Sequence, residues 1–302
     1  MIGLHYPGET EILDDKLRAS APGCFVTLSD GITHYELSGP ETGQVVVLIH
    51  GFSIPLQIWD TVFHPLVEAG FRVLRYDLYG RGFSDRPLKS YNQDLFDQQL
   101  LHLLKALGVK NPVDLIGLSM GGAISVLFCD RHPELARKLI LIDPAGFPGD
   151  MPGWAKWISA PLLGEFVMSF FSEKSLLSSI AGEIYSLEQY PNYLQIAIQQ
   201  MKIKGYRRAL LSTLRHDLFS DLSEIYQRVG KQNRSSCLIW GVEDKIIPFG
   251  IHKQVRQAIP DMIFYPIEAA GHVPHYERPH AVIPILIDFL NGSGDCTSVR
   301  EV

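Results

Sequence analysis

The sequence has few cysteines, no excess of basic residues and no long apolar runs, and each of these absences excludes a class of protein. Its 302 residues include only four cysteines, Cys24, Cys129, Cys237 and Cys296, which lie far apart and form no C-x-x-C pair. Four cysteines are too few to stabilise a chain of this length by disulfides, so we expect reduced thiols. An excess of basic residues is also missing, because 27 Lys and Arg stand against 33 Asp and Glu, a net charge of -6. A nucleic-acid partner is therefore not expected.

Long uninterrupted apolar runs are absent as well. The most apolar region, residues 157–171, is broken by Pro161, Gly164 and Glu165. It falls short of the ~18 to 20 apolar residues that a membrane-spanning helix needs. The first residues carry acidic side chains where a secretory signal would be basic and then apolar. We therefore expect no membrane span and a cytoplasmic protein, while the oligomeric state stays open.

Short runs rich in Val, Ile and Leu recur along the chain and alternate with amphipathic stretches, as in parallel sheets buried on both faces. Residues 24–37 predict an antiparallel hairpin that turns at Asp30-Gly31. This order predicts an α/β fold: a mostly parallel central sheet with an antiparallel edge and helices on both faces. Strands are predicted at 45–49, 71–77, 113–118, 138–143, 237–241 and 262–267, and helices at 59–69, 92–107, 121–132, 221–232, 249–258 and 279–290.

One interval breaks this alternation. More than ninety residues separate Asp143 from Cys237, whereas a crossover between parallel strands needs only ~10 to 12. The excess predicts an inserted unit, and its helix formers and aromatic residues indicate a helical cap. We therefore expect an α/β core at 1–145 and 215–291, a cap at 146–214, and a disordered tail at 292–302.

The most specific motif is GLSMGG at 117–122, which matches G-x-S-x-G between an apolar strand and an apolar helix. A nucleophile in this context sits on a sharp strand-to-helix turn, and Gly117 and Gly121 permit the crowded backbone there. The turn lifts the hydroxyl to the first turn of the following helix, whose amides face the reacting group. Ser119 is the predicted nucleophile; a serine merely tolerated in a glycine-rich turn is the alternative.

An oxyanion needs at least two donors that are fixed before the charge develops, and main-chain amides are rigid donors. The amide of Met120 is expected to supply one. The amide of Phe52 is expected to supply the other, because Phe52 follows the first parallel strand and Gly51 lets the main chain approach closely. We expect His50 to support this loop rather than to transfer protons.

Eleven histidines compete for the role of general base. His272 follows the last predicted strand and should therefore lie at the same sheet edge as the serine. His275 and His280 are the alternatives, with a capping or packing role favoured for His275. A metal site built from these three histidines is not expected, since their spacing matches no zinc pattern and Pro274 and Pro279 interrupt the helix.

A carboxylate that orients the base is expected just past the penultimate strand. Asp244 has the shorter side chain and the better position there, and Glu243 is the near alternative. Asp143, at the end of the strand predicted at 138–143, is the more distant rival. The order Ser119, Asp244, His272 is the chain order typical of this architecture.

These motifs resemble the α/β-hydrolase superfamily, in the capped branch that includes esterases, monoacylglycerol-lipase-like enzymes and meta-cleavage-product hydrolases. The resemblance covers about residues 24–291 and rests on VVVLIHGF, YDLYGRGFSDRP, GLSMGG, WGVEDKIIP and AAGHVPHYERP in that order. It implies that Phe52 and Met120 carry the oxyanion amides, and that Asp77, Arg81 and Ser84 organise turns near the site. The chain departs from the meta-cleavage hydrolases at HGFSI, where those enzymes show a longer loop rich in glycine and proline.

Together, the motifs and the resemblance predict a serine hydrolase that cleaves carboxylic esters through an acyl-enzyme on Ser119, without a cofactor or a metal. A serine at this position argues against the halide- and epoxide-opening relatives, which use an aspartate. Carbon-carbon hydrolysis and a slow-turnover small-ligand receptor are the alternatives. The substrate is expected to be an ester or lipid-like small molecule in an apolar pocket. Candidate pocket residues, for each of which packing within the cap is the alternative, are Trp154, Trp157, Phe166, Met168 and Phe170.

Overall fold

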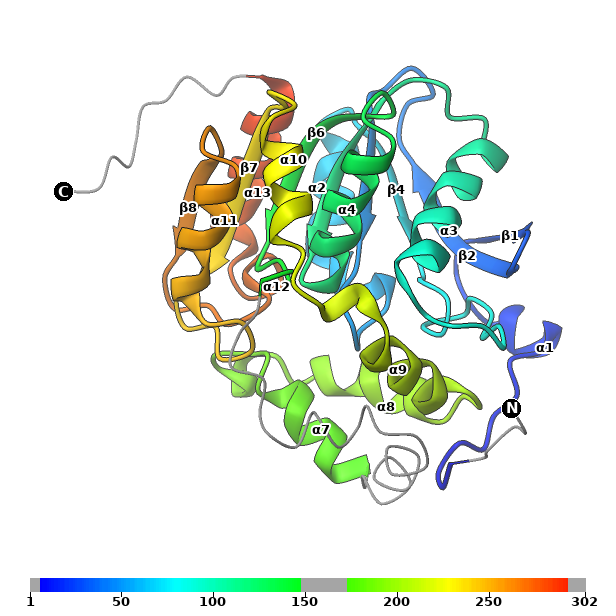
Figure 1. Ribbon diagram of the computed structural model, residues 1–302. Coiled ribbons are helices and arrows are strands. Elements are labelled where there is room, and N and C mark those ends of the chain that lie inside the picture. Colours follow the sequence, from blue (N-terminus) through cyan, green and yellow to red (C-terminus); the bar gives the residue numbers. More distant parts are fainter. Residues whose placement is uncertain (1–5, 148–172, 293–302) are drawn as a thin grey trace.

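The computed structural model of the protein describes residues 6–147 and 173–292 (Figure 1). Within them, eight strands form one sheet in the order β1-β2-β4-β3-β5-β6-β7-β8. β2 pairs antiparallel with β1 and β4, and the other neighbouring strands are parallel. The predicted fold class is confirmed. The strands are β1 (Cys24–Leu28), β2 (Gly31–Ser38), β3 (Val45–Ile49), β4 (Arg72–Tyr76), β5 (Val113–Leu118), β6 (Ala136–Ile142), β7 (Ser236–Gly241) and β8 (Ile263–Ile267).

Helices connect the parallel strands close to where the amphipathic stretches predict them. The predicted helix at 249–258 is divided into a 3₁₀ turn, η4 (Phe249–Ile251), and a helix, α11. The helices are α1 (Asp15–Arg18), α2 (Asp60–Glu68), α3 (Gln93–Ala106), α4 (Met120–Arg131), α7 (Glu173–Ala181), α8 (Tyr193–Met201), α9 (Tyr206–Arg215), α10 (Ser223–Gly230), α11 (His252–Ala258), α12 (Pro274–Glu277) and α13 (Pro279–Asn291). The other 3₁₀ turns are η1 (Leu56–Trp59), η2 (Leu187–Gln189) and η3 (Asp217–Phe219).

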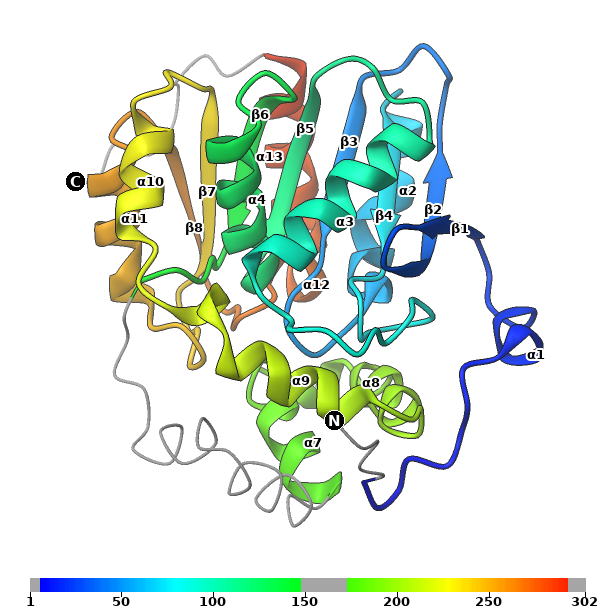
Figure 2. The same cartoon turned by 45° about the vertical axis from the view of Figure 1, so that its right-hand side comes forward.

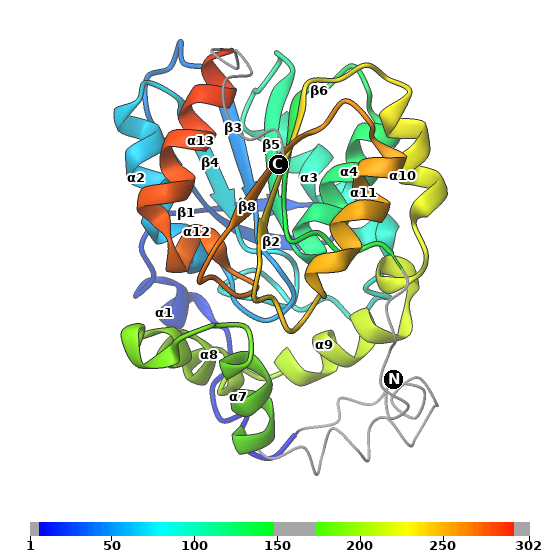
Figure 3. The ribbon, with the colours of Figure 1, turned by 90° about the vertical axis from the view of Figure 1, so that its left-hand side faces the viewer.

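The sheet buries both of its faces, and each face has its own hydrophobic core. Along β3, Val47 and Ile49 belong to one core, and Val46 and Leu48 belong to the other, as the two-residue period of a strand requires. Helices α3, α4, α10 and α11 cover the first face, and α2, α12 and α13 cover the second (Figures 2 and 3). The continuous apolar run at 45–49 is therefore explained by burial on both sides.

Helices α7, α8 and α9 come from the long interval between β6 and β7 and lie beyond one end of the sheet (Figure 2). The hydroxyl of Tyr206 in α9 donates a 3.1 Å hydrogen bond to the carbonyl of Ser53, in the loop after β3. The amide of His272, in the loop after β8, donates a 2.8 Å bond to the carbonyl of Glu183. These contacts identify the end that the helices cover as the carboxyl edge of the parallel strands.

No helix in the two described ranges combines the length and the apolar character needed to cross a bilayer.

Candidate active site

The four carboxyl ends of β5, β6, β7 and β8 lie side by side, because these strands are consecutive parallel neighbours in the sheet. Ser119 follows β5, Asp143 follows β6, Asp244 lies in the turn after β7, and His272 lies in the loop after β8. All four side chains are at least nine-tenths buried. Crevices outside the carboxyl ends of parallel strands are where open α/β sheets bind their ligands.

Ser119 sits on a strained turn between β5 and α4. Its φ of 54° and ψ of -118° are sparsely populated for residues other than glycine, and such strain costs about 1–3 kcal/mol. The surroundings require small neighbours: a Cβ on Gly121 would lie 2.1 Å from the carbonyl oxygen of Ile49, and one on Gly117 would lie 2.3 Å from that of Gly121. This packing explains the two glycines of the motif and holds the turn in its strained form.

The loop after β3 lies against Ser119. A Cβ on Gly51 would come within 3.5 Å of the Cβ of Ser119, an ordinary van der Waals distance. On the other side of the serine, Met120 begins α4, where the first amides of a helix have no partner within the helix. The main chains of Gly51-Phe52 and Met120 therefore border the serine from two elements.

His50 supports this loop, as expected. Its buried ring is linked through Nδ1 to the carbonyl oxygen of Gly51 (2.8 Å) and accepts at Nε2 from the amide of Leu78 (2.9 Å). An acceptor at Nε2 makes Nδ1–H the donor. Burial lowers the pKa of His50 to about 4, so the ring is neutral near pH 7. Since the carbonyl of Gly51 and the amide of Phe52 belong to one peptide plane, this bond holds the Phe52 amide in place.

The YDLYGRGFSDRP segment organises turns beside the same loop. Asp77 is fully buried, and its carboxylate accepts from the amides of Leu56 (2.9 Å) and Phe83 (2.8 Å). The hydroxyl of Ser84 donates to the carbonyl of Asp77 at 2.6 Å. The guanidinium of Arg81 donates to the carbonyl of Phe52 at 2.9 Å. Each contact joins main chain to side chain, which suits a structural role.

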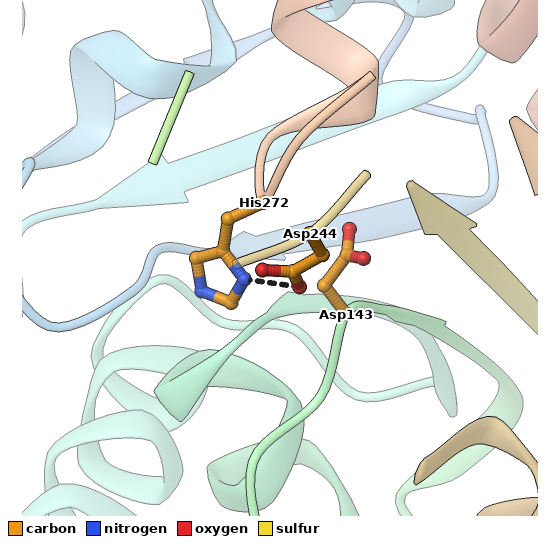
Figure 4. Close-up of side chains that lie close together, drawn as sticks. All are labelled: Asp143, Asp244 and His272. Atoms are coloured by element: carbon orange, nitrogen blue, oxygen red, sulfur yellow. Dashed lines mark hydrogen bonds and ion pairs between the residues drawn. The ribbon is translucent and has the colours of Figure 1, made fainter. Parts of the chain in front are cut away.

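His272 and Asp244 form a buried pair (Figure 4). The Nδ1 of His272 lies 2.7 Å from Oδ2 of Asp244. The other carboxylate oxygen accepts from the amides of Ile246 (2.7 Å) and Ile247 (3.0 Å). With Nδ1–H committed to the carboxylate, Nε2 is the nitrogen that can exchange a proton.

The environment of His272 tunes its basicity. Burial acts to lower the pKa of this imidazole, but the charge of Asp244 and the hydrogen bond to it act in the other direction, and Glu183 and Glu277 reinforce them. The balance raises the pKa above the ordinary value of 6.5. The imidazole is neutral at pH values above that raised pKa, and the neutral form is the one that general-base catalysis requires.

The alternative site residues have other partners. Glu243 accepts the amide of Ala270 at 3.0 Å and so braces the loop that leads to His272. His275 packs its ring 4.4 Å from that of Trp59 and bonds through Nε2 to a carbonyl at 3.2 Å. Burial lowers the pKa of His275 to about 3, which fits the packing role expected for it. His280 is exposed in α13.

Comparison with known proteins identifies the family. A family model described as "Alpha/beta hydrolase family" matches residues 46–285. The chain belongs to the alpha/beta hydrolase family. The suspected family is thereby confirmed, and a hydrolase activity is the class that this family supports.

Three similar proteins illustrate the range within the family. Lipase 3 of Moraxella sp. is 26% identical, over 78% of this chain and 74% of its own. A 2-hydroxy-6-oxo-6-phenylhexa-2,4-dienoate hydrolase of Comamonas testosteroni is also 26% identical, over 87% of this chain and 92% of its own. Among solved structures, an enol-lactonase from Burkholderia xenovorans LB400 superposes with a TM-score of 0.77 at 21% identity, over 89% of this chain and 100% of its own. At that identity the last match shows the fold alone.

Two glutamates of this alpha/beta hydrolase approach the candidate site without having been singled out in the sequence. The carboxylate of Glu277 accepts the amides of Gly271 (2.7 Å) and Tyr185 (2.8 Å). That of Glu183 accepts the hydroxyls of Ser53 (2.7 Å) and Tyr193. Glu277 lies in the AAGHVPHYERP block, so its place in a motif beside His272 could have marked it as a residue near the site. Glu183 lies in the long interval between β6 and β7, where no motif marks it.

The site of this alpha/beta hydrolase also contains a set of possible metal ligands. Among the described residues, one donor atom from each of Asp143, Asp244 and His272 lies within 4.8 Å of the others. The bond between His272 Nδ1 and Asp244 Oδ2 already occupies two of the available donors, so an ion would have to displace the shared proton. The arrangement suits a hydrogen-bonded pair.

The predicted pocket residues Trp154, Trp157, Phe166, Met168 and Phe170 lie outside the described residues.

Proposed function

We propose that the protein is a serine hydrolase that cleaves carboxylic esters, with Ser119 as nucleophile, His272 as general base and Asp244 as the orienting acid. The observation that carries the proposal is the His272–Asp244 hydrogen bond of 2.7 Å, at the same sheet edge as the strained turn of Ser119. It holds the imidazole in the tautomer whose Nε2 accepts a proton. The strained, glycine-flanked turn presents the serine hydroxyl at the edge of the sheet, where a nucleophile can reach a substrate.

In the proposed mechanism, His272 removes the proton from the Ser119 hydroxyl as Oγ attacks the acyl carbonyl. The amides of Phe52 and Met120 bind the oxyanion. His272 then protonates the leaving alcohol, and an acyl-enzyme remains on Ser119. Water enters, gives its proton to His272 and releases the acid, so the cycle requires no cofactor.

The proposed substrate is an apolar acyl or aromatic ester, bound under a cap formed by residues 146–214. The apolar residues in the first part of that segment support this class. The similarity to Lipase 3 of Moraxella sp. supports ester cleavage within the family. A carbon-carbon hydrolase is the second candidate, because the Comamonas testosteroni relative is named as a hydrolase of a dienoate. The shorter HGFSI loop favours the ester.

Replacement of the proposed nucleophile and base tests the mechanism. Ser119→Ala and His272→Ala should each reduce turnover of p-nitrophenyl esters by about 10⁶-fold, the size of the loss when the serine or histidine of the subtilisin triad is removed. Ser178→Ala and His280→Ala are matched controls, because both side chains are exposed, and they should retain full activity. A loss below about tenfold in either active-site variant would rule out its role.

A substrate panel separates the two candidate reactions. Short and long acyl esters, monoacylglycerols and vinylogous diketones should be compared by kcat/KM on the wild-type protein. Esters are expected to be the better substrates. A clear preference for the diketones would replace the ester assignment with carbon-carbon hydrolysis. Stoichiometric rather than catalytic product release would instead indicate a ligand receptor.

A further inference from the structure

Asp143 is a second buried carboxyl beside the proposed triad acid (Figure 4). It directly follows β6, is 0% exposed, and has a φ of 43°. Its Oδ1 accepts the amide of Gly241 at 2.9 Å. Its Oδ2 is buried and has no hydrogen-bond partner among the described residues. A buried acceptor without a donor is costly, so the state of this oxygen requires an explanation.

The two carboxyls compete for negative charge. Both lie in one buried cluster with His272, and neighbouring carboxyls in such a place do not both ionise readily. Asp244 accepts from the amides of Ile246 and Ile247 and lies against Nδ1 of His272. Asp143, within the described part of the chain, accepts from one amide. Hydrogen bonds to the charged form favour it. The negative charge therefore belongs on Asp244.

A proton on Oδ2 resolves both problems at Asp143. It removes the second charge, and it converts the unpartnered acceptor into a donor beside the Asp244 carboxylate. Burial, followed by the charge of Asp244, raises the pKa of Asp143 well above its ordinary range, and Glu277 adds to the effect. The titratable groups around the cluster are His272, Asp244, Glu277 and Glu183.

We propose that Asp143 is a positioning residue of the triad: a buried, protonated carboxyl that donates a hydrogen bond to Asp244 and holds this acid in place against His272. The proposal rests on the roles proposed above for Asp244 and His272. It makes the two aspartates a pair that carries one proton, with Asp244 as the ionised member. In this arrangement both aspartates help to orient the base: Asp244 binds His272 directly, and Asp143 holds Asp244.

Asp143→Asn is the conservative variant that keeps the hydrogen bonds proposed for Asp143 but cannot ionise. The amide oxygen can accept from Gly241 and the NH₂ group can donate to Asp244, so this variant preserves the proposed contacts without a titrating proton. Asparagine also tolerates a positive φ better than most residues. Asp143→Ala removes both contacts. Circular dichroism and thermal melting establish whether each variant is folded.

Infrared spectroscopy tests the protonated state directly. The measurement uses the Ser119→Ala variant near pH 7.5, because it does not depend on catalysis. The carbonyl stretch of a protonated carboxyl should be present in this variant and should vanish when Asp143→Asn is added. Its absence from the parent protein would overturn the proposal. The measurement stays valid if Ser119 proves not to be the nucleophile. A failure of this proposal can therefore be told apart from a failure of the proposed function.

The titration of His272, followed by NMR in the same background, gives a second criterion. If Asp143 is neutral, Asp143→Asn should shift the midpoint by less than about 0.3 pH units. If Asp143 is ionised, its replacement removes a negative charge near the imidazole and lowers the midpoint by about one unit or more. The second outcome would contradict the proposal.

Kinetics on p-nitrophenyl esters provide the functional criterion. Asp143→Asn should retain kcat within about threefold. Folded Asp143→Ala should lose about tenfold or more in kcat with little change in KM, because it loses an orienting contact rather than a substrate contact. Equal activities of the Asn and Ala variants would argue against a positioning role.

Discussion

The hydroxyl of Ser53 donates a 2.7 Å hydrogen bond to Oε1 of Glu183. Ser53 directly follows Phe52 in the loop after β3, and Glu183 lies between α7 and η2. The main-chain carbonyl of Glu183 also accepts the amide of His272 at 2.8 Å. One residue of the long interval between β6 and β7 therefore contacts both the loop of the proposed oxyanion donor and the loop of the proposed base.

Glu183→Ala is expected to lower kcat by about tenfold, because the Ser53 contact that steadies the oxyanion loop is lost. Glu183→Gln keeps an oxygen that can accept from Ser53 and should retain most of the rate. It should also move the acid limb of the pH profile downwards, since the carboxylate of Glu183 raises the pKa of His272. Steady-state kinetics across pH measure both effects.

Glu188→Ala is the control for these variants, because Glu188 is exposed in η2 of the same segment. It should behave as wild type. If Glu183→Ala showed an unchanged kcat and pH profile, the contact with Ser53 would be structural only.

The pH dependence of kcat/KM should report the neutral form of His272. Activity should fall as the pH drops through the pKa of the free base, and the midpoint should lie above 6.5 because Asp244 raises that pKa against the effect of burial. The measurement is a pH–rate profile on a p-nitrophenyl ester with the activity of His280→Ala as reference. A midpoint clearly below 6.5 would contradict the charge environment described for His272.

Asp143 should lower the free energy of unfolding as the pH rises, whereas an aspartate in a salt bridge raises it. Its pKa in the folded protein is raised, so its contribution is most favourable below the unfolded pKa and is lost as pH rises towards the folded value. Asp143→Asn cannot ionise and should gain stability relative to wild type as pH rises. The melting temperature at pH 8 should exceed that of wild type by at least about 2 °C, with a smaller gain at pH 5. An equal difference at both values would count against a buried titrating carboxyl.

Gly121→Ala should destabilise the protein by about 1–3 kcal/mol or more, because the new Cβ would meet main-chain oxygens of Ile49 and His50 at 2.1 and 2.6 Å. Rigid backbone cannot move aside as a flexible side chain would. Gly250→Ala is the matched control, since nothing lies within 4 Å of the position that its Cβ would take and its φ is not positive. It should change stability by no more than about 0.5 kcal/mol. Denaturant unfolding of both variants measures the difference, and equal stabilities would contradict the close approach of α4 to β3.

The strands and most helices could be predicted because their signals are local. The runs at 45–49 and 113–118 coincide with β3 and β5, since strands buried on both faces are rich in Val, Ile and Leu. The glycines around Ser119 are likewise a local requirement of a tight turn. The position of Asp244 and His272 after neighbouring strands follows from the topology of a parallel sheet.

Contacts between distant segments could not be predicted in this way. Glu183 reaches Ser53 across 130 residues of sequence, and no periodicity or motif encodes such a pairing. The partners of the three candidate acids are contacts of this kind. Asp244 was favoured over Glu243 and Asp143 by its position after β7, but the group that each carboxylate binds depends on the direction of its side chain in the packed structure.

The residue pattern by itself predicted the α/β alternation, the long interval after β6 and the serine-centred turn, because each depends on residues close together in the chain. The tertiary structure supplied the contacts themselves: Asp244, which its sequence position favoured, lies against His272, Glu243 braces the loop before His272, and Asp143 lies beside Asp244 without a partner for its second oxygen among the described residues. A difference of a few tenths of an ångström decides whether a hydrogen bond forms, and such precise positions arise only when the whole sheet and its loops are packed together.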